Sequence, residues 1–258
     1  MHSDKIIHYI IKELNSYCDN AGLKGFVVGV SGGIDSAVTS TLCAKTGKRV
    51  LALNMPIHQA KNQDSLSSRH IEWLEKAFSN VQGTRLDLSP AFDALAETLP
   101  PDIQDDLSMA NTRSRLRMLT LYAFASHHRL LVAGTGNKVE DFGVGFFTKY
   151  GDGGVDISPI ADLLKSEVRQ IGLALGVMQE IIQAPPTDGL WADNRTDESQ
   201  IGASYEELEW AMTIAPTKKP GNFTKREKDV LAIFHRLHDR NRHKMEPTPV
   251  IKIPERYR

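Results

Sequence analysis

The chain has 258 residues, 41% hydrophobic and 24% charged, which is enough apolar material for one large α/β domain. Its 31 Lys and Arg residues against 32 Asp and Glu residues give a net charge of −1, which argues against a nucleic-acid partner, because such proteins carry a strong basic excess. The two cysteines, Cys18 and Cys43, lie far apart and form no C-x-x-C pair, so disulfide, zinc and thiol-relay chemistry are disfavoured.

The first predicted element is an amphipathic helix at the N-terminus. Apolar residues recur at helical spacing from Ile6 to Cys18, and the pattern ends before Gly22. This segment does not resemble a signal peptide, and no later apolar stretch is long enough to span a membrane. We therefore expect a cytoplasmic protein without membrane contact.

Strand-like runs then alternate with helical segments. Four runs cover residues 26–30, 49–54, 83–88 and 130–133, and a short fifth run covers 155–158. Strands separated by helices imply right-handed crossovers and a parallel sheet. We therefore predict a Rossmann-like α/β fold, with a twisted parallel sheet of about five strands flanked by helices and with ligands at the carboxyl ends of the strands.

Two later helices have clear start signals. Ser204 and Thr224 are each followed three residues later by a Glu, which is the capping-box pattern. Residues 184–203 precede the first of these helices and are rich in Pro, Gly, Asp and Thr. We predict a long loop there, of the kind that often forms a lid.

The segment after the first predicted strand has the features of a phosphate-binding turn. Two glycines let backbone N–H groups point into one concavity, two serines add hydroxyl donors, and the following helix adds free N–H groups and a positive dipole end. A carboxylate in this segment would repel phosphate unless a cation lay between them, which points to magnesium. The residues of this segment are Val30, Ser31, Gly32, Gly33, Ile34, Asp35 and Ser36.

Other glycine-rich phosphate motifs do not match. The segment lacks the Lys that a P-loop requires, and no G-x-G-x-x-G follows the strand. Later in the chain, Gly134 and Gly136 imitate part of a dinucleotide fingerprint, but Val139 stands where its third glycine should be. An ordinary strand-to-helix turn is the remaining alternative, although the ordered set Ser-Gly-Gly-x-Asp-Ser is much rarer than a glycine turn alone.

A second polar constellation follows the fourth predicted strand. If the first and fourth strands are neighbours, Glu140 reaches the crevice that holds Asp35, and the two carboxylates can share a magnesium ion that bridges ATP phosphates. Lys149 and Lys165 are candidate phosphate partners. For either lysine alone, a solvated surface charge is the simpler interpretation.

The ordered blocks of the sequence resemble the NAD synthetase family. The first block, Ser-Gly-Gly-x-Asp-Ser, is shared by the ATP pyrophosphatases (the PP-loop superfamily, with an adenine nucleotide alpha hydrolase-like fold), which split ATP between its α and β phosphates. The blocks typical of NAD synthetases follow from residue 112 to the tail: Thr-Arg-Ser-Arg-Leu-Arg-Met with Tyr122 beyond, Gly-Thr-Gly-Asn-Lys-x-Glu, Phe-Thr-Lys-Tyr-Gly-Asp-Gly-Gly-x-Asp, Pro-Thr-Asp-Gly-Leu, Ser-Tyr-Glu-Glu-Leu and His-Lys.

The resemblance implies an ATP-dependent ligase. Members of the family convert nicotinic acid adenine dinucleotide (deamido-NAD) to NAD through an adenylate, using ATP and an ammonia source and releasing AMP and pyrophosphate. It also implies a homodimer with the dinucleotide near the subunit interface. We expect one NAD synthetase domain over residues 1–258 that uses ammonia directly, because the glutamine-using form needs a large amidase domain for which this length leaves no room.

The resemblance also assigns residues. The ATP-binding set is Val30, Ser31, Gly32, Gly33, Ile34, Asp35, Ser36, Thr135, Lys165 and Thr187. The magnesium ligands are Asp35 and Glu140, and the predicted catalytic residues are Asp35, Asp152 and Lys165, with Asp152 or Asp156 able to accept the proton that ammonium loses. The deamido-NAD set is Arg115, Lys149, Asp156, His243 and Lys244.

The helical pattern around Arg115 agrees with an anion-binding role. Arg115 shares an apolar stripe with Met118, Leu119 and Tyr122, and an Arg on such a stripe is seldom buried without an anion. A nearby Asp or Glu is the alternative partner.

The chain departs from the family pattern at a few positions. Ile34 replaces a Gln often found within the turn, Asn54 stands where many members have an Arg over the adenosine, and Met245 follows His-Lys where Arg is common. Two alternative functions remain: another adenylating amide synthetase of the GMP synthetase kind, and a non-catalytic adenine-nucleotide sensor on the same fold.

Overall fold

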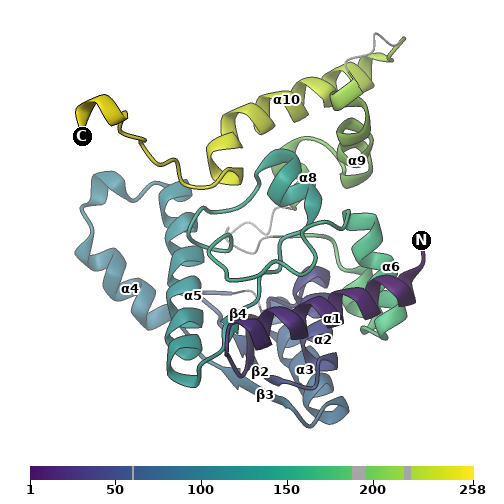
Figure 1. Ribbon diagram of the computed structural model, residues 1–258, viewed down its shortest axis with the longest axis vertical. Helices are drawn as coiled ribbons and strands as arrows, with labels where there is room; N and C mark the ends of the chain where they lie inside the picture. The colour runs from purple at the N-terminus through teal and green to yellow at the C-terminus, as the bar shows by residue number, and fades with distance from the viewer. Residues whose placement is uncertain (60, 188–195, 218–221) are drawn as a thin grey trace.

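The computed structural model describes residues 1–59, 61–187, 196–217 and 222–258, and Figure 1 labels its main elements. The strands are β1 (Gly25–Gly29), β2 (Arg49–Asn54), β3 (Val81–Arg85) and β4 (Leu131–Val132). The α-helices are α1 (Ser3–Asn20), α2 (Ile34–Lys45), α3 (Lys61–Ala77), α4 (Ser89–Thr98), α5 (Asp106–His128), α6 (Lys165–Leu175), α7 (Gln179–Gln183), α8 (Asp197–Ile201), α9 (Tyr205–Ile214) and α10 (Lys225–Met245). Shorter helical turns are η1 (Pro101–Ile103), η2 (Val139–Val144), η3 (Ala215–Thr217) and η4 (Glu255–Tyr257).

The four strands form one parallel sheet in the order β3-β2-β1-β4. From β1 the chain moves outward to β2 and β3, and it then returns to the other side of β1 to form β4. The direction of winding therefore changes between β1 and β4. In open parallel sheets, ligands bind in the crevice at the carboxyl ends of two such strands. The predicted α/β fold with a parallel, helix-flanked sheet is confirmed.

The fifth predicted strand is not present as a strand. Residues 155–158 contribute only one isolated parallel bridge, between Ala133 and Ile157. The Asp156 carboxylate accepts the N–H of Val132 at 2.8 Å, so a side chain occupies a donor that a longer ladder would need. β3 also begins two residues before the predicted run at 83–88, and Leu88 packs in the core instead.

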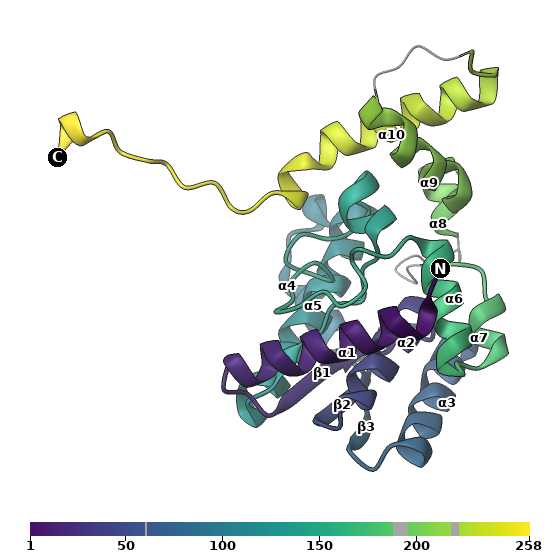
Figure 2. The same cartoon turned by 45° about the vertical axis from the view of Figure 1, so that its right-hand side comes forward.

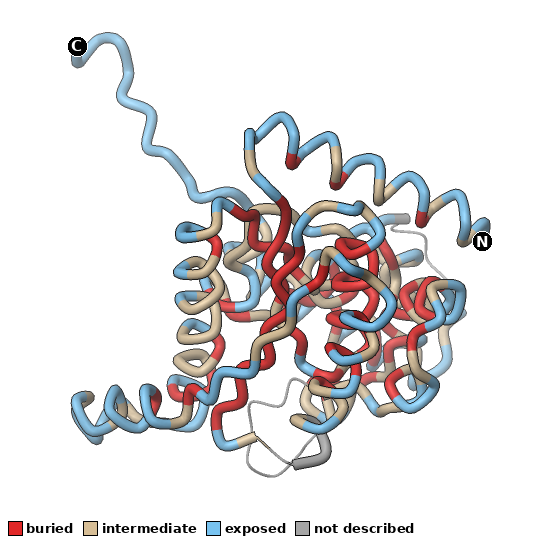
Figure 3. The backbone as a smooth tube through the Cα atoms, turned by 90° about the horizontal axis from the view of Figure 1, so that it is seen from below, coloured by how far each residue is buried: buried red, intermediate tan, exposed pale blue. Residues whose placement is uncertain are grey.

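The sheet lies between two helical layers, as the two ribbon views show (Figure 2). Side chains alternate along a strand, so Phe26 and Val28 enter a core with α1, α2, α3 and α6, while Val27 enters a second core with α4 and α5. Buried residues concentrate in the central strands, and exposed residues cover the outer helices and the C-terminal tail (Figure 3). In the described part of the chain, no helix combines the length and hydropathy needed to cross a bilayer.

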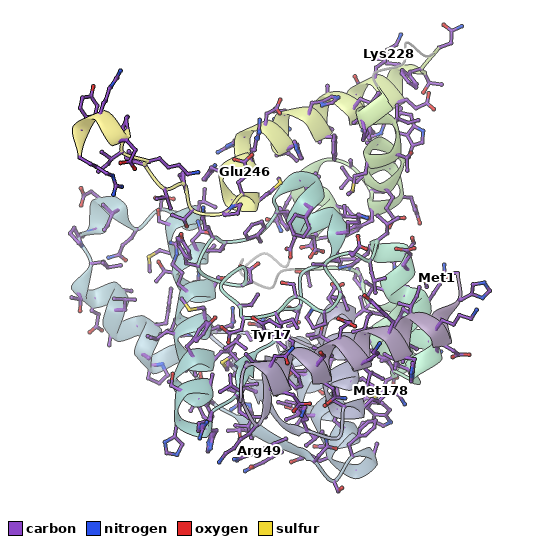
Figure 4. The ribbon with its side chains drawn as sticks, in the orientation of Figure 1. Met1, Tyr17, Arg49, Met178, Lys228 and Glu246 are labelled. Carbon is purple, nitrogen blue, oxygen red and sulfur yellow. The ribbon has the colours of Figure 1, made fainter. Side chains whose placement is uncertain are left out.

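A third core joins η2, α9 and α10 above the sheet. The predicted capping boxes are confirmed: Ser204 caps α9 and Thr224 caps α10, each with the reciprocal Glu contact. Figure 4 labels Lys228 in the first turn of α10 and Glu246, the residue directly after its end. Within the loop predicted at 184–203, the structure has the short helix α8, and residues 188–195 lie outside the described residues.

A buried histidine links α2 to α3. The Nε2 atom of His70 lies 3.0 Å from the Ser40 hydroxyl, and its ring stacks on Trp73 with centroids 5.5 Å apart. Among the described residues, Nδ1 of His70 has no hydrogen-bond partner. Burial lowers the pKa of His70 to about 4, so the ring is neutral near pH 7.

We expect His70 to make the stability of the protein fall with acidification. The unfolded chain protonates this ring near its ordinary pKa of 6.5, whereas the folded chain protonates it only near about 4. Between these two values protons bind preferentially to the unfolded chain, so the free energy of unfolding is unaffected by His70 above pH 6.5 and decreases as the pH falls from 6.5 towards 4. A shift of this size corresponds to about 3 kcal/mol. Urea unfolding of His70→Gln should therefore show a flatter pH dependence than wild type across this window. His8→Gln, on the exposed side of α1, is the control, and equal slopes for His70→Gln and wild type would contradict the prediction.

Candidate active site

The turn after β1 is stabilised by hydrogen bonds of its own serines. Gly32 has a φ of +87°, a conformation that side chains rarely adopt, and it turns the chain towards α2. The Ser36 hydroxyl accepts the N–H of Ser31 at 3.1 Å and donates to the carbonyl of Gly33 at 2.9 Å. Gly33 is the N-cap of α2 and offers no side-chain acceptor to the first helical N–H groups. These groups are therefore available to an anion.

Neighbouring residues in the first turn of α2 point in different directions. Ile34 is buried in the core against Gly172 of α6, which explains why an apolar residue is tolerated in the turn. Asp35 instead lines the cavity described below. From α3, the Ser67 hydroxyl donates to the carbonyl of Val30 at 2.6 Å and anchors the start of the turn.

Two carboxylates from distant parts of the chain meet on one buried ammonium. Lys165, the first residue of α6, is 2% exposed, and its Nζ lies 2.5 Å from Asp35 Oδ2 and 3.0 Å from Glu140 Oε1. Burial lowers the pKa of Lys165, but the charges of Asp35 and Glu140 more than offset this and hold the pKa above its ordinary value. The lysine is therefore a permanent cation between two acids.

Asn137 and Tyr205 complete this cluster. Asn137 is fully buried: its Nδ2 donates to Asp35 Oδ1 at 3.3 Å, and its Oδ1 accepts the N–H groups of Val139 and Glu140 at the start of η2. The Tyr205 hydroxyl lies 2.5 Å from Glu140 Oε1, and the Tyr205 ring centroid lies 4.7 Å from the Lys165 ammonium.

The cluster fits a magnesium ion that is shared with a phosphate ligand. Its two carboxylates already converge on one cation, as metal ligands must. Among the described residues, no group of three or more His, Cys, Asp and Glu side chains could hold a metal by itself. Magnesium is commonly held by one or two carboxylates plus substrate phosphates, and the pair Asp35 and Glu140 matches that number of protein ligands.

A cavity of about 240 Å³ opens beside the cluster, at the carboxyl ends of β1 and β4. Eight of the residues that the sequence assigned to the site line it, namely Val30, Ser31, Gly33, Asp35, Ser36, Thr135, Glu140 and Asp152. Lys165 lies buried behind its carboxylate partners, and Thr187 is half-buried outside the lining.

The far end of the cavity was not predicted from the sequence. Its walls are mainly apolar, formed by Leu53, Met55, Met118 and Leu121. Arg117 reaches across and donates from Nε to the carbonyl of Met55 at 3.0 Å. An apolar slot with a few polar groups at its edge can hold a planar base.

Asn54, where many family members carry Arg, also lines this end. Its Nδ2 donates to Asp64 Oδ1 at 2.6 Å, and Arg85 pairs with the other oxygen of Asp64 at 2.8 Å. Arg85 lies opposite Asn54 in the ladder between β2 and β3. An Arg from the neighbouring strand therefore lies next to the position where the family Arg is missing.

Four of the five residues assigned to deamido-NAD come from three segments that contact one another: Arg115 from α5, Lys149 from the loop after η2, and His243 and Lys244 from the last turn of α10. The C-terminal end of α10 lies above this part of the molecule in the ribbon views (Figures 1 and 2). Arg115 donates to the carbonyl of Lys149 at 3.3 Å, and Lys149 donates to the carbonyl of His243 at 2.6 Å. Lys244 donates to the carbonyl of Phe147 at 2.7 Å. Within the described residues none of these three cations pairs with a carboxylate, so their charges are available to an anion.

Arg115 differs from its prediction in one respect. It does lie on a helix, α5, but its side chain is exposed, and Leu119 on the same stripe is 62% exposed. The stripe is therefore buried only in part, because Tyr122 packs against the second core while Arg115 and Leu119 are exposed.

The two candidate proton acceptors differ in their surroundings. Asp152 lines the cavity, and its Oδ1 accepts from the Ser114 hydroxyl at 2.6 Å and from the N–H of Thr148 at 3.0 Å. Burial raises the pKa of Asp152, although these hydrogen bonds oppose the shift. Asp156, by contrast, has both oxygens bonded, one by Tyr122 and one by Val132.

Comparisons with known proteins identify the family of this chain. A family model described as NAD synthase matches residues 6–248. The NH3-dependent NAD(+) synthetase of Methanosarcina acetivorans is 36% identical over 266 residues, and the match covers 100% of both chains. Among solved structures, the NMN synthetase of Francisella tularensis has a TM-score of 0.85 at 32% identity, covering 98% of this chain and 100% of that one. The NH3-dependent NAD synthetase of Campylobacter jejuni has a TM-score of 0.80 at 25% identity, with the same coverage. The family inferred from the sequence blocks is thus confirmed, and the chain belongs to the NAD synthase family of ligases.

Proposed function

We propose that this chain amidates deamido-NAD with free ammonia, consuming ATP and releasing AMP and pyrophosphate. The observation that supports this most directly is the cluster of Asp35, Glu140 and Lys165 beside the glycine turn, because a buried cation there holds two acids for magnesium next to the phosphate-binding N–H groups of α2. The NH3-dependent relatives that match over their whole length support ammonia as the nitrogen source.

In this proposal ATP lies in the cavity, with its base in the apolar end and its phosphates on the turn of α2. The carboxylate of deamido-NAD attacks the α-phosphorus and pyrophosphate leaves, which forms an acyl adenylate. Ammonia then attacks the acyl carbon, and AMP leaves. Magnesium, when bound, neutralises the phosphate charge that develops on the leaving group.

The protein contributes position and charge. The N–H groups of α2 stabilise the departing pyrophosphate, the buried Lys165 ammonium holds the two carboxylates that bind magnesium, and no covalent bond to the enzyme is required. Ammonium must lose a proton before it attacks. Asp152 is the proposed acceptor rather than Asp156, because it lines the cavity and burial raises its pKa.

The deciding experiment is incubation of the protein with ATP, magnesium, ammonium and deamido-NAD, with detection of NAD, AMP and pyrophosphate. NAD and equimolar AMP are expected. Nucleotide binding without ATP consumption would indicate a sensor. Pyrophosphate release with another carbonyl substrate but not with deamido-NAD would indicate a different amide synthetase.

The likeness to an NMN synthetase suggests a second candidate acceptor, nicotinic acid mononucleotide. This compound is deamido-NAD without its AMP part and carries the same reacting carboxylate. The three cations Arg115, Lys149 and Lys244 favour the dinucleotide, because its two linked phosphate groups can contact different cations, whereas the mononucleotide carries a single phosphate group. Comparing kcat/KM for the two acceptors under the same conditions tests this choice. A higher value for the mononucleotide would reverse the assignment.

We expect Arg115→Ala to weaken deamido-NAD binding far more than ATP binding. The exposed guanidinium lies by Lys149 rather than in the cavity, so its loss should remove a charged hydrogen bond to the dinucleotide only. Such a bond is worth roughly 1.5–3 kcal/mol, or about 10- to 100-fold in Kd. Isothermal titration with each ligand measures this, and Arg69→Ala, a surface pair with Glu180, is the control. An equal effect on both ligands, or an effect on ATP alone, would contradict the assignment.

The family resemblance carries two further proposals. We infer a homodimer with the dinucleotide site near the interface, which sedimentation analysis can test. A single NAD synthetase domain over residues 1–258 and a cytoplasmic location remain predictions.

A further inference from the structure

Tyr205 is a fully buried polar side chain in the candidate site to which no role has been given. It is the first residue of α9, it is 2% exposed, and it belongs to the Ser-Tyr-Glu-Glu-Leu block. Its hydroxyl lies 2.5 Å from Glu140 Oε1 and 3.2 Å from Asp197 Oδ2, so its single proton is donated in the shorter contact, to Glu140, and its ring lies 4.7 Å from the Lys165 ammonium. One side chain therefore contacts two members of the cation cluster.

The backbone of Tyr205 is held firmly. The preceding Ser204 exchanges hydrogen bonds with Glu207, at 2.9 and 3.2 Å, which fixes the start of α9. The N–H of Tyr205 itself donates to Glu198 Oε1 on α8 at 2.9 Å. A group held this way can impose its geometry on a more mobile partner such as a glutamate side chain.

The contacts of Glu140 show what Tyr205 imposes. Both the Tyr205 hydroxyl and the Lys165 ammonium bind the same oxygen, Oε1. In the described part of the chain, no hydrogen bond reaches Oε2, and the residue lines the cavity. The hydroxyl thus fixes the rotation of the carboxylate and keeps one oxygen open towards the ligand side. Groups that orient metal-binding side chains in this way typically affect metal affinity or activity by 10- to 100-fold.

We propose that Tyr205 is a positioning residue of the proposed NAD synthetase reaction, which orients Glu140 for magnesium and supports the Lys165 ammonium against its ring. The inference rests on the proposed function, because it concerns the same metal and phosphate site. It assigns Tyr205 a role in metal binding in addition to its packing in the third core.

The test is Tyr205→Phe, which keeps the ring and removes only the hydroxyl. Binding of Mn²⁺, as a magnetic probe for the magnesium site, is followed by electron paramagnetic resonance in the presence of an ATP analogue with a methylene group between the α and β phosphorus atoms. We expect the Kd for Mn²⁺ to rise about 10-fold or more. The matched control is Tyr150→Phe, which loses a hydroxyl contact to Thr248 at the surface and should bind Mn²⁺ as wild type does.

A double-mutant cycle separates positioning from a purely structural role. If Tyr205 acts through the Glu140 carboxylate, Tyr205→Phe should have little further effect on Mn²⁺ binding in a Glu140→Gln background. Thermal unfolding of each variant without ligands checks the fold. An unchanged Kd in Tyr205→Phe, or equal effects in both backgrounds, would overturn the proposal.

The same measurement separates this inference from the proposed function. If wild type forms no NAD but Tyr205→Phe still weakens Mn²⁺ binding through Glu140, the proposed reaction fails and the positioning role of Tyr205 in metal binding stands. If NAD forms and the Kd is unchanged, the reverse holds.

Discussion

Asp35→Ala is expected to lower NAD formation by about 10²-fold or more at saturating magnesium, ATP, deamido-NAD and ammonium. Asp35 lines the cavity and is one of the two carboxylates that meet on the buried cation, so its loss removes a metal ligand next to the phosphates. The fold should persist, because Lys165 keeps its contact with Glu140.

Steady-state assays over a range of magnesium concentrations measure this effect. Asp162→Ala is the control, since this aspartate is 96% exposed and pairs only with Lys138. Near-normal turnover of Asp35→Ala would exclude the residue as a magnesium ligand.

Lys165→Met is expected to impair both stability and activity. The variant leaves Asp35 and Glu140 facing each other without the ammonium, in a site where the lysine is 2% exposed. Removing one partner of a buried ion pair typically costs about 3–5 kcal/mol. Turnover should fall by at least about 10²-fold, because the two carboxylates that bind magnesium lose the group that holds them, and the magnesium that stabilises the leaving pyrophosphate is then misplaced.

Added magnesium should restore part of the stability of Lys165→Met. A divalent cation can compensate two unpaired carboxylates, so the gain in unfolding free energy with magnesium should be larger for the variant than for wild type. Urea unfolding with and without magnesium measures the difference. Lys138→Met, which breaks an exposed pair, serves as control, and a wild-type unfolding curve for Lys165→Met would contradict the role of Lys165 in holding the two acids.

Several features could be predicted because they depend on neighbouring residues. Ser-Gly-Gly-x-Asp-Ser after an apolar run encodes a strand, a turn and a helix start within a dozen residues, and the structure has β1, the turn and α2 there. The capping boxes at Ser204 and Thr224 are equally local. The proximity of Asp35 and Glu140 was predicted on one further condition, that the first and fourth strands are neighbours, and β1 and β4 do lie side by side.

The remaining features depend on contacts between distant segments. Lys165 lies 130 residues after Asp35, and a surface lysine was the simpler interpretation until the fold buried its ammonium between two acids. Likewise, the helical pattern placed Arg115 on an apolar stripe, but only the Tyr122 end of that stripe packs against the core, and Arg115 is exposed.

The sequence by itself therefore determined the fold class, the family, the glycine turn and the two acids, Asp35 and Glu140, that the structure brings together. Only the tertiary structure decided that residues 155–158 contribute one bridge to the sheet, that Asn54 is held by Asp64, and that Tyr205 contacts Glu140. The physical reason is that periodicity and capping act over a few residues. Burial, ion pairing and the rotation of a carboxylate depend instead on which distant segments pack together.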